Sequence, residues 1–275
     1  MAMSGNGLVV RVVTAVVLAS VFLGLVWVEA VQAGLALAVT LVAGVGLQEY
    51  FAIMRAKGID VRSDLCVVAG MLITASGMYG RVELLNVMLV AGAIGVVFLQ
   101  LVRPGVTIDT LVTAVGGLLY VGWTAGHVNL LHSVEGLGAG LVTVLIVAVA
   151  LTDCGAYFVG KAIGKHKLAP VVSPNKTWEG SVGGFVLTGA GMAVLWWMRE
   201  GLEWTSYPDW AVWKYFVMGA VLSIASQIGD LTESALKRDA GVKDSGKLLP
   251  GHGGVLDRCD GYLFAAPVLF YLVVL

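Results

Sequence analysis

Acidic, hydroxyl and basic side chains recur at helical spacing near residue 230. Asp230, Ser234 and Lys237 stand at positions i, i+4 and i+7, so they share one face if this stretch is helical. A carboxylate, a hydroxyl and an ammonium stacked in this way can hold a metal ion, its water and a phosphate oxygen. The alternative is an ordinary charged helix end that leaves a membrane, where Lys and Arg side chains extend toward the surface.

A second group of acids opens the last apolar stretch of the chain. Asp257 and Asp260 are three residues apart, so both carboxylates can face one side near a helix start. Paired acids at a membrane-facing helix end are costly unless they are neutralised. A divalent cation held by carboxylates and substrate phosphates would neutralise them and would polarise a triphosphate. Salt bridges from Arg258 or Lys237 alone are the alternative.

The connection over residues 241–255 combines glycines with charges of both signs. Glycines let a backbone approach phosphates closely, and lysines such as Lys243 neutralise them. The spacing G-x-x-x-x-G-K is that of a P-loop, but Leu248 stands where a P-loop needs Ser or Thr, and no strand precedes it. We therefore reject a P-loop. His252 is expected either to donate a hydrogen bond to a phosphate or to form one within its own loop.

Another candidate anion-binding stretch covers residues 173–180, with the sequence Ser-Pro-Asn-Lys-Thr-Trp-Glu-Gly. Hydroxyls and a lysine beside a helix N-terminus suit anion binding, and Thr177 equally suits a helix cap. Asp153 lies upstream in an otherwise apolar segment, and an acid within a membrane is a functional hypothesis by default. We expect Ser173 and Lys176 to complete an anion pocket that has Asp153 on its wall.

Long apolar segments must position these residues. Charged residues make up only 13% of the 275, against about a quarter in a soluble domain, and the mean hydropathy is +0.89. We predict an all-α fold, a polytopic integral membrane protein of about nine transmembrane helices, with N-terminal helices in 1–135 and the site in 136–275. The third, fourth and last candidate spans are short or weak. About twenty residues are needed to cross the bilayer, and the candidates are 8–28, 31–53, 64–80, 84–101, 110–131, 138–160, 180–198, 212–229 and 256–275.

The distribution of Lys and Arg predicts the orientation. Thirteen of the seventeen fall in the even-numbered connections between these segments and three in the odd-numbered ones. Since cytoplasmic loops carry the excess of Lys and Arg, we expect the N-terminus and the site on the cytoplasmic side and the C-terminus outside. The membrane would be a bacterial-type inner (plasma) membrane, with segment 8–28 retained as a helix. The net charge of −1 gives no indication of a nucleic-acid partner.

The run from Ser234 to Asp260 resembles the signature of phosphatidate cytidylyltransferases (CDP-diacylglycerol synthases). It follows the pattern S-x-L-K-R-x4-K-D-x-G-x2-L-P-x-H-G-G-V-x-D-R-x-D. The 173–180 stretch and the segment with Asp153 and Tyr157 also resemble that family, so the likeness covers about 140–275. The first half is similar only in hydropathy. Cys259 departs from the pattern, which usually has an aliphatic residue or Thr there.

The resemblance implies that CTP and phosphatidate give CDP-diacylglycerol and pyrophosphate, with Mg²⁺ and a possible second ion, K⁺. The phosphate of phosphatidate would attack the α-phosphorus of CTP in line, with catalysis resting on positioning and charge neutralisation. A homodimer is compatible with the sequence. The expected catalytic residues are Asp230, Lys237 and Asp257; the substrate-binding residues are Ser173, Lys176, Ser234, Arg238, Lys243, His252 and Arg258; and the metal ligands are Asp230, Asp257 and Asp260.

Two other functions stay open from the sequence. A cytidylyltransferase acting on a different lipid phosphate would carry the same motifs, because they report nucleotide and phosphate handling rather than lipid tails. A transporter could use Asp153, Asp230 and Asp257 to line an ion pathway, which predicts acids spread through the membrane depth and two related halves. The acids here gather toward one end of their segments, and no half repeats the other.

Overall fold

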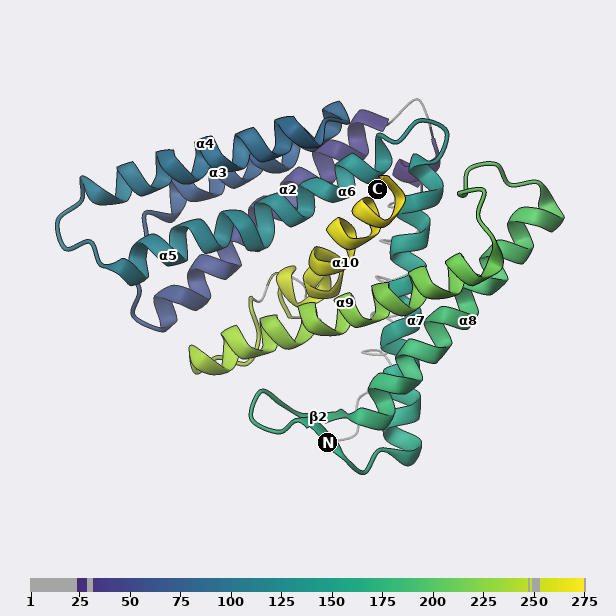
Figure 1. Cartoon of the computed structure of the whole chain (residues 1–275). Helices are drawn as coiled ribbons and strands as arrows, with labels where there is room; N and C mark the ends of the chain where they lie inside the picture. The colour runs from purple at the N-terminus through teal and green to yellow at the C-terminus, as the bar shows by residue number, and fades with distance from the viewer. Residues whose placement is uncertain (1–23, 29–31, 247, 249–252, 275) are drawn as a thin grey trace.

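The computed structural model describes residues 24–28, 32–246, 248 and 253–274. Long helices dominate it, with one small two-stranded sheet between two of them (Figure 1). The helices are α2 (Gln32–Ala56), α3 (Ser63–Ser76), α4 (Val82–Leu101), α5 (Ile108–Gly117), α6 (Thr124–His132), α7 (Gly138–Ile163), α8 (Trp178–Leu202), α9 (Val212–Asp239) and α10 (Leu256–Val274). A 3-10 turn (Gly77–Tyr79) follows α3, and a π-helical segment (Leu118–Trp123) joins α5 to α6.

Six helices of the described chain are long and apolar enough to cross a membrane, as in an integral membrane protein. The expected count of nine is not confirmed. The third candidate span becomes the 14-residue α3 with its 3-10 turn, and α10 carries three charged residues among its first five. Most of segment 8–28 lies outside the described residues. The six are Ala33–Ala56, Val82–Leu101, Ile108–His132, Gly138–Ile163, Trp178–Leu202 and Val212–Asp239.

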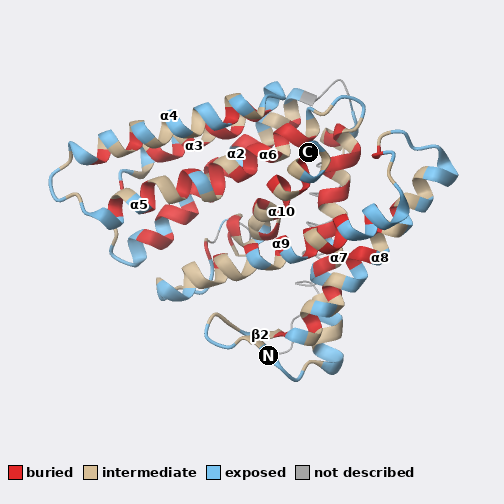
Figure 2. Ribbon diagram, in the orientation of Figure 1, coloured by how far each residue is buried: buried red, intermediate tan, exposed pale blue. Residues whose placement is uncertain are grey.

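Apolar side chains on the outer faces of the helices agree with a lipid environment. Val87, Ile94 and Phe98 of α4 are each about three-fifths exposed or more, at 61%, 66% and 63%. Figure 2 shows the outer side of α4 as mostly exposed, with the buried residues gathered between the helices. Exposed apolar surface on this scale marks contact with lipid or with another protein.

A short hairpin was not expected from the sequence. Strands β1 (Lys167–Ala169) and β2 (Ser173–Thr177) pair antiparallel, with Lys167 opposite Thr177 and Ala169 opposite Ser173. Strands of three and five residues are too short to show a clear alternation of apolar and polar residues. Thr177 ends β2 and caps α8, because its hydroxyl accepts a hydrogen bond from the Gly180 N–H at 3.1 Å.

Two groups of helices meet at α10. The segments from α2 to α6 lie side by side, and α7, α8 and α9 form the second group (Figure 1). Helix α10 packs against α9 and α7 on one side and against α6 and α2 on the other. The start of α10 therefore lies where both groups can contribute side chains.

Glycine allows the two helices that carry the predicted acids to approach closely. At Gly229 of α9, a Cβ atom would collide with the backbone carbonyl of Asp260 in α10. Small residues allow this kind of backbone contact between membrane helices. As a result, Asp230 lies directly beside the turn of α10 that carries Asp260.

Candidate active site

The first part of the site joins the hairpin to α9. Lys176 of β2 forms an ion pair with Asp230, with 2.5 Å between Nζ and Oδ2. The Ser234 hydroxyl donates a longer hydrogen bond of 3.4 Å to Oδ1 of the same carboxylate. The Lys176 ammonium is buried and has no hydrogen-bond partner within the described residues beyond this ion pair. The structure therefore brings the predicted anion-binding stretch to the predicted helical face.

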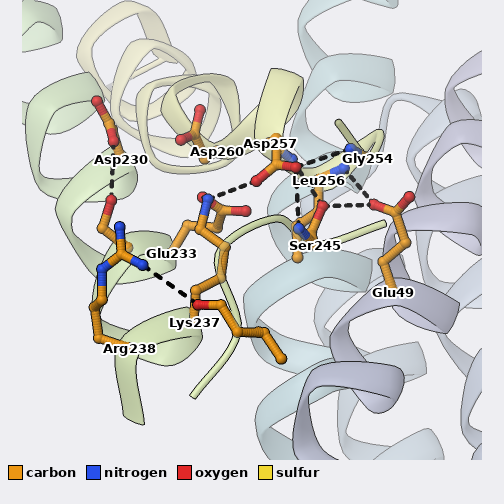
Figure 3. A network of polar contacts seen from close by, with 12 residues as sticks. Glu49, Asp230, Glu233, Lys237, Arg238, Ser245, Gly254, Leu256, Asp257 and Asp260 are labelled. Carbon is orange, nitrogen blue, oxygen red and sulfur yellow. Dashed lines mark hydrogen bonds and ion pairs between the residues drawn. The ribbon is translucent and has the colours of Figure 1, made fainter. Parts of the chain in front are cut away.

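The second part of the site surrounds Lys237, which lies about two turns after Asp230 on α9. Its ammonium lies between the carboxylates of Glu233 and Asp257, and the Nζ–Oδ1 distance to Asp257 is 2.5 Å (Figure 3). The other oxygen of Asp257 accepts hydrogen bonds from the N–H groups of Gly254, at 2.8 Å, and Ser245, at 3.0 Å. Protein donors thus engage both oxygens of Asp257.

Two acids of this part had no role in the sequence analysis. Glu233 is 1% exposed, and its Oε1 has no hydrogen-bond partner among the described residues. Glu49 of α2 is 8% exposed and contacts Ser245 and the start of α10 (Figure 3). The signal that could have identified Glu49 is its position, since it is an acid within the apolar segment 31–53.

Carboxylates from two further helices interact with the Lys176–Asp230 ion pair. Asp153 of α7 and Asp260 of α10 both interact electrostatically with Asp230 of α9. Asp153 also interacts with the cations of Lys176 and Arg258. One oxygen of Asp260 accepts a 2.7 Å hydrogen bond from the N–H of the next residue. Figure 3 shows Asp260 between Asp230 and Asp257.

These acids can be tested as ligands for a divalent ion. Within the described part of the chain, no three Asp, Glu, His or Cys side chains are grouped so that they could hold a metal by themselves. Mg²⁺ is usually held through one or two carboxylates, with waters and substrate phosphates completing its shell. Asp230 fits that role, because its side chain is 35% exposed and its Oδ1 makes only the long contact with Ser234 among the described residues. Asp257 has less acceptor capacity left, since three protein donors already bind it.

Comparison with known proteins identifies the family. The model of the cytidylyltransferase family matches residues 9–275. The chain belongs to the cytidylyltransferase family. The match confirms the resemblance found in the run from Ser234 to Asp260, and it extends into the first half of the chain, where only hydropathy had been similar.

Similar relatives of this chain are named phosphatidate cytidylyltransferase. The one from Synechocystis sp. is 37% identical over 267 residues, which cover 86% of this chain and 87% of the relative. The one from Brucella suis biovar 1 is 46% identical over 154 residues, covering 56% of this chain and 54% of the relative. The one from Staphylococcus aureus (strain COL) is 47% identical over 141 residues, 51% of this chain and 50% of the relative. The chain thus spans about half the length of the Brucella and Staphylococcus relatives it matches.

The other predicted binding residues are less closely grouped. Arg238 is exposed, and its Nη1 donates to the carbonyl of Val242 at 3.4 Å. Lys243 and Arg258 are exposed, and Ser173 is half-buried in β2. The prediction for His252 lies outside the described residues.

An apolar groove of about 1040 Å³ is lined in part by α9, the helix that carries Asp230 and Glu233. Thr232 and Leu236 line it from α9, the helix that carries Asp230 and Lys237. The hydroxyl of Tyr120 is buried without a hydrogen-bond partner in the described chain, and it interacts electrostatically with Glu233. The groove and the charged site thus share helix α9, and the further lining of the groove includes Tyr50, Leu119, Tyr120, Phe264, Val268 and Leu272.

Proposed function

We propose that this cytidylyltransferase converts CTP and phosphatidate into CDP-diacylglycerol and pyrophosphate. One observation supports the proposal beyond family membership. The same stretch of α9 carries charged side chains and side chains that line the apolar groove. Asp230 and Lys237 belong to the charged face, and Thr232 and Leu236 belong to the groove. Such a junction suits a substrate with a phosphate head and acyl tails. The names of the relatives agree with it.

The reaction needs little covalent chemistry from the protein. A phosphate oxygen of phosphatidate attacks the α-phosphorus of CTP, the bond to the β-phosphate breaks, and pyrophosphate leaves with the electron pair. The attacking oxygen is already anionic near neutral pH, so no strong base is required. Positioning and charge neutralisation then supply the rate enhancement. The buried Lys176 ammonium, with N–H donors left open, suits a triphosphate oxygen.

Mg²⁺ would neutralise and polarise the phosphate oxygens when bound. Asp230 would be its main protein ligand, with Asp257 and Asp260 of α10 as the neighbouring acids, and K⁺ is proposed as a second ion. Lys237 would act by holding Asp257, since its ammonium already lies between two carboxylates. Ser234, Arg238, Lys243, Arg258, Ser173 and His252 are retained as proposed contacts to the phosphates.

The groove gives the lipid a defined place. We propose that an acyl chain lies along Leu119, Val268 and Leu272 while the phosphate head stays beside α9. Leu119 and Leu272 are 48% and 38% exposed, so the groove can be entered from the side of the helices. The lipid would then enter sideways from the bilayer, without leaving it.

The arrangement in the membrane is proposed from the distribution of Lys and Arg. The hairpin and the end of α9, which both carry lysines, would lie on the cytoplasmic side, where CTP is found. The N-terminus would be inside and the C-terminus outside. In this arrangement α3 with its 3-10 turn, α10 and segment 8–28 complete nine spans.

The experiment measures the transfer of radiolabel from CTP to CDP-diacylglycerol. Purified chain in lipid receives radiolabelled CTP, phosphatidate and Mg²⁺, and the variants Asp257→Asn and Asp64→Asn are compared with it. Labelled CDP-diacylglycerol should form with the wild type and with Asp64→Asn, an exposed acid in the first turn of α3. It should be lost with Asp257→Asn and on chelation. No product from folded wild type would contradict the phosphatidate assignment and would favour another lipid phosphate.

A further inference from the structure

Glu49 connects the first group of helices to the charged site. It belongs to α2, yet its carboxylate accepts three hydrogen bonds from residues about 200 positions later in the chain. The donors are the N–H of Val255 at 3.0 Å, the N–H of Leu256 at 2.7 Å and the hydroxyl of Ser245 at 3.0 Å. Figure 3 shows Glu49 on the far side of Ser245 from Lys237.

These contacts serve the start of α10. The first N–H groups of a helix have no partner within the helix and need acceptors from elsewhere. At the start of α10, three side chains provide these acceptors. The Glu49 carboxylate accepts from the N–H groups of Val255 and Leu256. Asp257 accepts from the N–H of Gly254, and the Ser245 hydroxyl accepts from the N–H of Asp257 at 3.3 Å. A carboxylate at this end also interacts favourably with the helix dipole.

The loop before α10 is shaped to receive the Glu49 carboxylate. At both Gly246 and Gly254, a Cβ atom would collide with the carboxylate oxygens of Glu49. At Gly254 it would also collide with the Ser245 hydroxyl. Only glycine therefore fits at these two positions while Glu49 keeps its place. The described residues at both ends of this loop therefore pack around the Glu49 carboxylate.

We propose that Glu49 is a positioning residue of the transferase site. Its hydrogen bonds fix Ser245 and the start of α10. The Ser245 N–H in turn donates to one oxygen of Asp257, and the other oxygen of Asp257 forms an ion pair with Lys237. Among the described residues, Glu49 forms no ion pair or hydrogen bond with Lys237 or with Asp230. The inference rests on the proposed function, because positioning is defined by the turnover it supports.

Glu49→Gln tests the proposal with little change of size. A glutamine has one acceptor oxygen, so its amide N–H₂ must face one of the N–H donors of Val255 or Leu256. We expect hydrogen exchange at these two amides to accelerate and kcat to fall about tenfold or more, because small misplacements in a site cost large factors in rate. KM for CTP should change less than about threefold, since Glu49 does not touch the substrate. Glu49→Asp, which keeps the charge, should restore part of kcat.

Glu83→Gln is the matched control, since Glu83 is an exposed acid in the first turn of α4. It should leave exchange at Val255 and Leu256, kcat and KM unchanged. A double variant of Glu49→Gln with Ser245→Ala should lose less kcat than the product of the two single losses, because both act through the same loop. If Glu49→Gln does not fold, Ser245→Ala takes its place in the same two measurements.

The outcomes separate this inference from the proposed function. Hydrogen exchange reads the position of the loop without any substrate, so it tests the Glu49 contacts even if the wild type made no CDP-diacylglycerol. Unchanged exchange in the folded variant would overturn the inference. Faster exchange with unchanged kcat would overturn it as well, because Glu49 would then hold the loop without serving turnover. A rise in KM for CTP with kcat intact would place Glu49 in substrate binding and would also contradict it.

Discussion

Two acidic clusters lie beside helix α9, and their central carboxylates are held in different ways. The Asp230 side chain is 35% exposed and, among the described residues, makes one ion pair and one long hydrogen bond. The Asp257 side chain is 10% exposed and is bound by a lysine and two backbone N–H groups. We call them the Asp230 cluster (Asp153, Lys176, Asp230, Ser234, Asp260) and the Asp257 cluster (Glu49, Glu233, Lys237, Ser245, Asp257).

The difference indicates that the two clusters have different functions, which the spacing of the acids alone did not show. Buried carboxylates that protein donors saturate are fixed before any ligand arrives, which is the condition for electrostatic preorganisation. A carboxylate with free acceptor capacity beside an open ammonium is suited to bind an ion and a phosphate. We therefore expect changes in the Asp257 cluster to affect stability and turnover together, and changes in the Asp230 cluster to affect mainly turnover.

Lys237→Met should have the largest effect. It removes the cation between Glu233 and Asp257 and leaves two buried carboxylates without compensation, which costs about 3–5 kcal/mol of unfolding free energy. Thermal unfolding in detergent and labelled-CTP turnover measure the two losses. Lys214→Met is the control, because Lys214 is exposed on the same helix and stands over two tryptophan rings. Unchanged stability of Lys237→Met would show that the Asp257 cluster is not held as described.

Asp230→Asn should lower turnover strongly and stability little. We expect a loss of kcat of about a hundredfold or more, in line with loss of a key electrostatic group. The free energy of unfolding should change by less than about 1 kcal/mol, because the ion pair with Lys176 is partly exposed. Both are read in the assays used for Lys237→Met. A destabilisation as large as that of Lys237→Met would remove the distinction between the clusters.

Lys176→Met should act mainly on the nucleotide. Its ammonium has N–H donors open beside Asp230, so its loss should raise KM for CTP about tenfold, the scale of one charged hydrogen bond. KM for phosphatidate should change less. Lys167→Met, an exposed lysine on the other strand of the hairpin, is the matched control. Equal KM values in both variants would take Lys176 out of the triphosphate site.

Val268→Phe should give the smallest effect. The added ring fills part of the apolar groove, so KM for phosphatidate should rise about fourfold, the factor that corresponds to losing the burial of one methylene group. KM for CTP should stay the same. Val87→Phe places the same change on the exposed face of α4, outside the groove, and should have no effect. A rise for CTP alone would contradict the assignment of the groove to the lipid.

Local spacing predicted the parts of the site that one helix can carry. Asp230, Ser234 and Lys237 lie on α9 as the i, i+4 and i+7 pattern required, and Asp257 and Asp260 open α10. The resemblance of one motif to a family was also sufficient to identify that family.

Contacts between distant segments could not be predicted in the same way. The hydrogen bond between Ser245 and Glu49 joins residues 196 positions apart, and no periodicity reports such a contact. The hairpin that delivers Lys176 is too short for a strand pattern. Asp230 and Asp257 receive the same predicted role from the sequence, because their charge and spacing are alike. Their burial and their hydrogen-bond donors, which differ, depend on contacts between distant segments.

The most direct test of this account is a Mg²⁺ titration of CDP-diacylglycerol formation by the wild type, Asp230→Asn and Asp257→Asn. The account predicts labelled product from the wild type and a higher Mg²⁺ concentration for half-maximal rate in Asp230→Asn, with unfolding temperature unchanged. Asp257→Asn should lose kcat and unfold at a lower temperature, with a smaller shift in Mg²⁺ requirement. No product from folded wild type at any Mg²⁺ concentration, or the larger Mg²⁺ shift in Asp257→Asn, would contradict it.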